Sequence, residues 1–221
     1  MNEYLLLKFL HVLGFAYWLG GDLGTYIASR SAVKAGVDGT SQATAIRIML
    51  ACDLSPRLAM PLMFTVGFHL AILVGALHAP AWAPLLVWCI GLGWLASATY
   101  LALNHFDSPF NRILARADLG FRALCSVTLL LWGAKECLSP ALVTGNWLAF
   151  KLVLFGWTVL AGIAVRMALR DFAPALLRLY QSSDDQVAID TLRRCILACR
   201  PWVWSIWAAL FLNAALGLHL L

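Results

Sequence analysis

Three ionisable side chains lie within one long apolar stretch of the sequence, residues 4–27. They are Lys8, His11 and Asp22, and a helical rotation of about 100° per residue places all three on one face together with Trp18. The stretch is long enough to cross a bilayer, where an ionisable group is costly and is a functional-site candidate by default. This face is therefore predicted to look into a helix bundle, where the imidazole of His11 is free to ligate a metal.

A second histidine, His69, lies in the middle of another apolar segment. With a helical rise of ~1.5 Å per residue, His11 lies ~10 Å below the start of its segment and His69 ~13 Å below the end of its own. If the two segments are antiparallel, the histidines share one depth, and Lys8 and Lys151 lie closer to the same surface. Axial imidazole, an apolar slot between helices and nearby cations for propionates are what a b-type haem requires. The sequence has no CxxCH motif, so such a haem is bound non-covalently.

The predicted site follows from this reading. His11 and His69 are the expected iron ligands, Lys8 and Lys151 are expected to hold propionates or an anionic substrate, and Trp18 is expected to line the cofactor. The expected role is redox, either electron transfer or an oxidase-like reaction. The sequence does not settle whether the protein is an enzyme, although a membrane oxidoreductase is one option.

Copper transport is the main alternative, because imidazole, thioether and thiol groups all bind copper. Met60 and Met63 lie ~9–14 Å from His69 by helical rise, so they are expected to form a relay and not one site with it. A protein whose histidines only pack, and a proton-coupled transporter with Asp22 as its switch, are further alternatives. The residues of the copper hypothesis are His11, His69, Met60, Met63 and Cys52.

The elements that position these residues are predicted from composition. Of 221 residues, 62% are hydrophobic and 12% are charged, against about 25% charged in soluble domains. We therefore expect an all-α, polytopic membrane protein, with residues 1–221 forming a single membrane domain and residues 168–200 a cytoplasmic helical region. About six transmembrane helices are expected in one bundle, at 4–27, 58–79, 82–104, 119–138, 147–167 and 201–221.

Most of the 16 basic residues lie in three regions that fall on the same side of this topology: 28–57, 105–122 and 166–200. The positive-inside rule makes that side cytoplasmic and puts both termini outside the cytoplasm, in an inner cell membrane of bacterial type. The same bias explains the net charge of +5 without a nucleic-acid partner. The bilayer is the expected partner; a quinone, a redox partner protein and a second copy of the chain remain candidates.

Two local patterns make further predictions. Asp53 and Arg57 are four residues apart and predict an ion pair, with Asp22 as an alternative partner for Arg57. The run of serine and aspartate at 182–185 predicts an N-terminal cap for a helix over about 185–199.

Three short motifs occur in the apolar segments: Lys8-Phe9-Leu10-His11 with Trp18-Leu19-Gly20-Gly21, Pro61 with Met60 and Met63, and Trp147-Leu148-Ala149-Phe150-Lys151-Leu152. These motifs resemble those of the CopD-like and HemJ-type membrane proteins. HemJ-type members are protoporphyrinogen oxidases that bind haem b, and their essential first-helix histidine and later-helix lysine correspond to His11 and Lys151. CopD-like members are associated with copper uptake across the inner membrane. The chain lacks the histidine–tyrosine cluster that follows the lysine in HemJ-type proteins, so the resemblance implies the haem more than the porphyrinogen oxidation.

Overall fold

The computed structural model describes residues 2–34, 38–104, 108–182 and 185–220. These residues are almost entirely helical, which confirms the predicted all-α class; the one β-type contact among them is an antiparallel bridge between Leu77 and Val143. The helices are α1 (Glu3–Ala32), α2 (Gly39–Leu73), α3 (Ala83–Leu103), α4 (Pro109–Leu138), α5 (Asn146–Ala168), α6 (Phe172–Gln181) and α7 (Gln186–Gly217).

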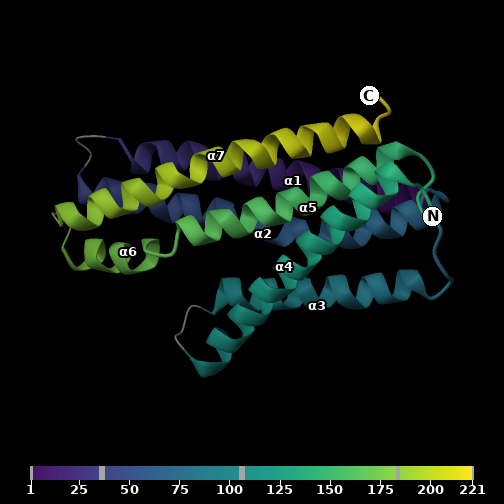
Figure 1. Cartoon of the computed structure of the whole chain (residues 1–221). Helices are drawn as coiled ribbons and strands as arrows, with labels where there is room; N and C mark the ends of the chain where they lie inside the picture. The colour runs from purple at the N-terminus through teal and green to yellow at the C-terminus, as the bar shows by residue number, and fades with distance from the viewer. Residues whose placement is uncertain (1, 35–37, 105–107, 183–184, 221) are drawn as a thin grey trace.

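Helices α1, α2, α3, α5 and α7 run back and forth lengthwise, and α4 runs at an angle to them (Figure 1). Both termini lie at one end of the bundle, which we call the terminal end, and α6 lies toward the other, which we call the α6 end (Figure 1). Helix α1 packs mainly on α2, α5 packs on both α4 and α7, and α3 packs mainly on α2. The connections after α2 and α4 meet at the terminal end, where the Leu77–Val143 bridge joins them.

Five helices are long and apolar enough to cross a membrane: α1, α2, α3, α5 and α7. The sixth predicted segment, 119–138, lies within α4, which is not among them. Helix α4 has 30 residues, but it carries Asp118, Arg122, Lys135 and Glu136 along its length.

Helix α2 differs from the prediction because it begins at Gly39 and continues through Pro56 and Pro61. A proline at position 56 has no N–H for the carbonyl of Cys52, the usual acceptor one turn earlier. Helix α1 approaches at this point: a Cβ on Gly21 would lie 2.6 Å from Pro56 Cδ and 3.0 Å from the Cys52 oxygen. Only glycine fits this contact, so the α1–α2 pair is closely packed in spite of the prolines.

Helix α7 is also longer than predicted. Asp185 accepts a hydrogen bond from the Ala188 N–H at 3.0 Å, which confirms the predicted cap. The helix then continues through Pro201 to Gly217, so the expected cytoplasmic helix and the last membrane segment form one helix of 32 residues.

A separate apolar core holds the α6 end together. It joins the end of α1, the start of α2, helix α6 and the first half of α7. At 1.5 Å per residue, the helices of 35 and 32 residues that contribute to it are longer than a hydrocarbon core of ~30 Å. The buried residues of this core are Ala28, Ala32, Ile46, Met49, Phe172, Ala175, Leu179, Ala188, Leu192, Cys195 and Ile196.

Candidate functional site

His11 lies in the interface between α1 and α2. Its ring packs on Gly67, where a Cβ would lie 3.1 Å from His11 Cε1. The Nδ1 atom is shielded from solvent and has no hydrogen-bond partner among the described residues. The interface therefore holds a half-buried imidazole whose Nδ1 makes no hydrogen bond within the described residues.

Lys151 reaches the same region from α5. Its ammonium group interacts electrostatically with His11, lies 5.8 Å from the centre of the Trp147 ring, and is 2.8 Å from the position of a Cβ on Gly217. No salt bridge joins it to an acidic side chain in the described part of the chain. The structure thus brings together two of the predicted site residues, from α1 and α5, without a compensating carboxylate.

His69 faces a different direction from His11. It lies two residues after Gly67, about 200° away around the helix. Its Nδ1 accepts a hydrogen bond from Trp88 Nε1 at 3.0 Å, and its Nε2 lies 3.5 Å from a Glu3 carboxylate oxygen. Both ring nitrogens are engaged, so coordination of a metal by His69 would require the side chain to leave Trp88.

Lys8 and Trp18 contact side chains other than His11 and Lys151. Lys8 is exposed on α1, with its ammonium 5.6 Å from the centre of the Tyr4 ring. Trp18 is buried and packs edge-on against Phe155 at a centroid distance of 6.2 Å. Lys8 therefore lies at the surface, while Trp18 belongs to the apolar core.

The two methionines of the copper hypothesis differ in their surroundings. The Met63 sulfur lies 2.9 Å from the position of a Cβ on Gly14, one turn along α1 from His11. The Met60 sulfur instead accepts a hydrogen bond from Arg122 Nη1 at 3.4 Å. A thioether is therefore available near His11, but the second methionine contacts a cation.

A buried ion network that the sequence reasoning missed joins α4 to α5. One oxygen of the buried Asp118 carboxylate accepts from Arg122 Nε at 2.9 Å and from Arg166 Nη1 at 3.0 Å. The Arg122 guanidinium also lies 5.3 Å from the centre of the Trp94 ring. The spacing of Asp118 and Arg122 was a visible signal in the sequence, but nothing in it pointed to Arg166.

Glu136 is a second buried acid that the sequence reasoning missed. Its side chain is 1% exposed, and one carboxylate oxygen accepts the backbone N–H groups of residues 141, 142 and 143 at 2.8, 3.0 and 3.3 Å. The other oxygen accepts from Trp132 Nε1 at 3.3 Å. Glu136 thereby fixes the loop that leads into α5, the helix that carries Lys151.

Asp22 lies beside Trp18 and Trp207 and within electrostatic reach of Asp53. The predicted ion pair between Asp53 and Arg57 is confirmed, so Arg57 is not the partner of Asp22. Asp22 has no salt bridge among the described residues.

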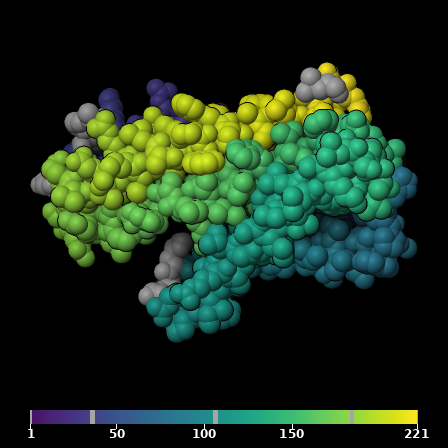
Figure 2. Space-filling model, viewed as in Figure 1, coloured from purple at the N-terminus to yellow at the C-terminus, as the bar shows by residue number. Residues whose placement is uncertain are grey.

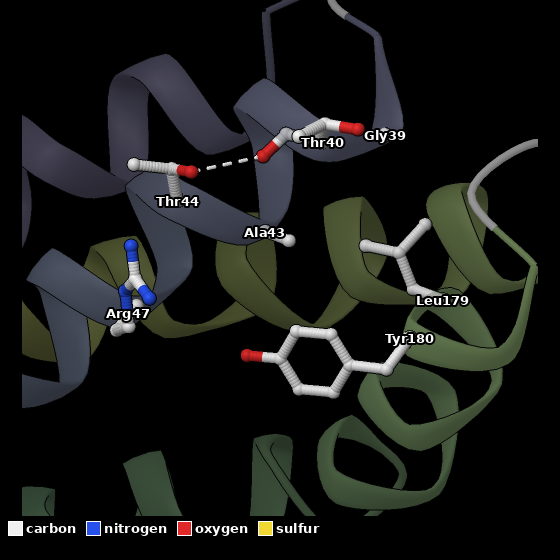
Figure 3. A pocket seen from close by; sticks show the side chains of 7 residues that line it. All are labelled: Gly39, Thr40, Ala43, Thr44, Arg47, Leu179 and Tyr180. Carbon is white, nitrogen blue, oxygen red and sulfur yellow. Dashed lines mark hydrogen bonds between the residues drawn. The ribbon is translucent and has the colours of Figure 1, made fainter.

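In the described residues, no group of three or more histidine, cysteine, aspartate or glutamate side chains could hold a metal ion. A depression of about 350 Å³ between the start of α2 and the end of α6 has hydroxyl groups and Arg47 in its wall (Figure 3). It lies at the α6 end, far along α1 and α2 from His11, and is not part of this site.

Comparison with family models, with characterised proteins and with solved structures finds no match to the chain.

Proposed function

We propose that the protein binds haem b in the membrane and has a redox role, with His11 as an axial ligand and Lys151 as a propionate partner. The observation that carries the proposal is the enclosed Nδ1 of His11, which has no hydrogen-bond partner among the described residues and lies within electrostatic reach of a lysine that pairs with no acid among them. A buried polar group without a partner is costly and calls for a ligand. Haem in such a site would supply reversible one-electron chemistry.

The residues around His11 fit this assignment. Gly67 leaves room for the imidazole next to α2, and Phe64, one turn before Gly67, belongs to an aromatic group with Phe68 and Phe155. Such side chains form an apolar wall suited to a porphyrin. Lys151 would neutralise a carboxylate with a charge-assisted hydrogen bond.

Copper uptake is the second candidate function, and it is favoured by the position of Met63. Imidazole and thioether are ligands that suit copper(I), and the Met63 sulfur lies against α1 one turn from His11. Because Met60 accepts from Arg122, this version needs only His11 and Met63.

We further propose that the α6 end faces the cytoplasm of a bacterial-type cell and that the terminal end faces outward. The basic residues of the α6 end support this orientation through the positive-inside rule. An alkaline phosphatase fused after the C-terminus should be active, and a fluorescent protein fused there should be dark; the opposite pattern would reverse the orientation.

The first test is the absorption spectrum of the detergent-purified protein, oxidised and then reduced with dithionite. We expect a Soret band that is lost in His11→Ala and kept in His78→Ala, a histidine of the terminal-end loops. Lys151→Gln should keep the spectrum but retain haem less tightly. If protein expressed with ample haem shows no Soret band, the haem proposal is wrong. Bound copper that depends on His11 and Met63 would then support the second candidate.

A further inference from the structure

The end of α7 has a backbone conformation that histidine rarely adopts. His219 has a φ of 53°, and it is the one residue other than glycine with a positive φ in the described part of the chain. The backbone N–H groups of His219 and Leu220 donate to the carbonyls of Leu216 and Ala215, at 3.3 and 3.0 Å. This is the Schellman ending of a helix, in which glycine is the usual residue at the left-handed position. Because histidine is less stable than glycine in this conformation, the side chain of His219 is a candidate for a role in binding.

The imidazole of His219 lies beside the residues that surround Lys151. It packs edge-on against Trp147, with 5.3 Å between the ring centres, and the Lys151 ammonium lies 5.8 Å from the centre of the same indole ring. Lys151 also contacts α7, since a Cβ on Gly217 would lie 2.8 Å from its nitrogen. Figure 2 shows the end of α7, in yellow, next to the green surface of the α4–α5 region at the terminal end. The start of α5 and the end of α7 thus bring an ammonium and an imidazole to one tryptophan.

Both groups are available to an anion. His219 is exposed and Lys151 is half-buried, and neither forms a salt bridge in the described part of the chain. The acid of the loop before α5, Glu136, is already bonded to three backbone N–H groups. Helix α5 begins at Asn146, directly before Trp147, so the positive end of its dipole adds to the attraction. The charges around Trp147 therefore favour carboxylate groups.

Haem b presents two such groups, because it carries two propionates. The proposed function assigns one propionate to Lys151, and one ammonium compensates one carboxylate. The second propionate needs another donor at the same edge of the cofactor. An imidazole has at least one N–H donor in either protonation state, and a hydrogen bond to a carboxylate is stronger than one between neutral groups.

We propose that His219 binds the second propionate of the haem, so that α5 and α7 together hold the carboxylate edge of the cofactor. This inference rests on the proposed function. It extends the predicted site, whose residues came from α1, α2 and α5, to the end of α7.

The test measures how fast haem leaves the detergent-purified protein for an excess of apomyoglobin, followed by the Soret band. His219→Gly removes the imidazole, and glycine suits the left-handed position, so the helix end should stay folded. The variant should release haem b about tenfold faster than the wild type, because a hydrogen bond to a charged group is lost. The dimethyl ester of haem b, which has no carboxylate, should leave both proteins at the same rate. His78→Ala, at an exposed histidine of the terminal-end loops, should behave like the wild type.

Three results would overturn the inference while the haem proposal stands. They are release of haem b from His219→Gly no faster than from His78→Ala, an equal acceleration for the dimethyl ester, and a lower unfolding temperature of the haem-free variant. The last two would assign His219 to packing on Trp147 instead of propionate binding. Wild-type protein without a Soret band would overturn the proposed function and this inference together, so the two failures are distinguishable.

Discussion

Two regions of this bundle bury ionisable side chains, and they differ in whether those side chains have partners of opposite charge in the described part of the chain. In the α4–α5 network, Asp118 bonds two arginines and Arg122 also contacts Met60 and the Trp94 ring. In the His11–Lys151 region, neither side chain has an acidic partner among the described residues. Burial of charge in a membrane is costly in both cases. The charges of the first region are compensated by contacts within the chain, whereas the described part of the chain offers no acidic partner to the second.

The largest effect on stability is expected when the acid is removed from the α4–α5 network. Asp118→Ala should lower the free energy of unfolding by about 3–5 kcal/mol, because a broken buried ion pair leaves an uncompensated charge. Thermal unfolding in detergent measures the effect. Asp171→Ala is the control, since Asp171 is exposed and its salt bridge in the described part of the chain is with its neighbour Arg170, at 3.4 Å. Equal unfolding temperatures for the two variants would show that the network contributes no stability.

A smaller loss of stability is expected at the other buried acid. Glu136→Gln keeps the shape of the side chain but removes the charge that three backbone N–H groups of the 141–143 loop share. The amide should release this loop, so limited proteolysis should cut it faster than in the wild type. Glu3→Gln, at the exposed start of α1, should not change the cleavage rate at the loop. A loop in Glu136→Gln as resistant as in the wild type would contradict the proposed role of the charge.

These two acids also show what sequence reasoning can reach. Local patterns were sufficient for the all-α class, the Asp185 cap and the Asp53–Arg57 pair, because each depends on composition or on residues within one turn. Arg166 and Asp118 are 48 residues apart, and their contact depends on how α4 packs on α5. Glu136 was not predicted, because its partners are backbone N–H groups of a loop. Such groups occur in nearly every residue type, so the sequence does not indicate the contact.

The candidate site shows the same limit. Depth along the helix can be counted from the sequence, and it placed His11 and His69 together. Rotation about the helix axis decides which groups meet, and here His11 contacts Gly67 while His69 contacts Trp88. The electrostatic interaction of His11 with Lys151 from α5 depends on the order of helices in the bundle; depth along the helices and the resemblance had both placed the two residues in one site. Cofactor binding by these residues stays a prediction.

The same contrast can be tested with the two histidines of α1 and α2, of which His69 is hydrogen-bonded and His11 is not at its Nδ1 in the described part of the chain. His69→Leu should cost about 1 kcal/mol in the free energy of unfolding, because Trp88 loses its acceptor. His11→Leu should cost less in cofactor-free protein, because no hydrogen bond of its Nδ1 is lost. Thermal unfolding of both variants after removal of bound cofactor measures the difference.

The order of these two effects is the informative result. If His11→Leu is the more destabilising variant without cofactor, the imidazole has a structural role that the described contacts do not reveal. The proposed difference between a hydrogen-bonded His69 and a His11 whose Nδ1 is not hydrogen-bonded would then be wrong.

The smallest effect is expected for a paired charge outside the membrane. The backbone N–H of Ala188 and the guanidinium of Arg178 hold the pKa of Asp185 below its ordinary value, which is about 3.9. A depressed pKa stabilises the folded state above the unfolded-state pKa, and this contribution is lost as the pH falls through the folded-state pKa. Asp185→Asn keeps an oxygen for the Ala188 N–H but removes the charge. Its unfolding temperature should therefore be slightly below that of the wild type near neutral pH, and the gap should close as the pH falls below about 4. If the difference in unfolding temperature stays constant down to the lowest pH at which the protein folds, the effect comes from the shape of the side chain and not from its charge. The charge of this cap would then contribute as little to stability as a solvent-exposed ion pair usually does.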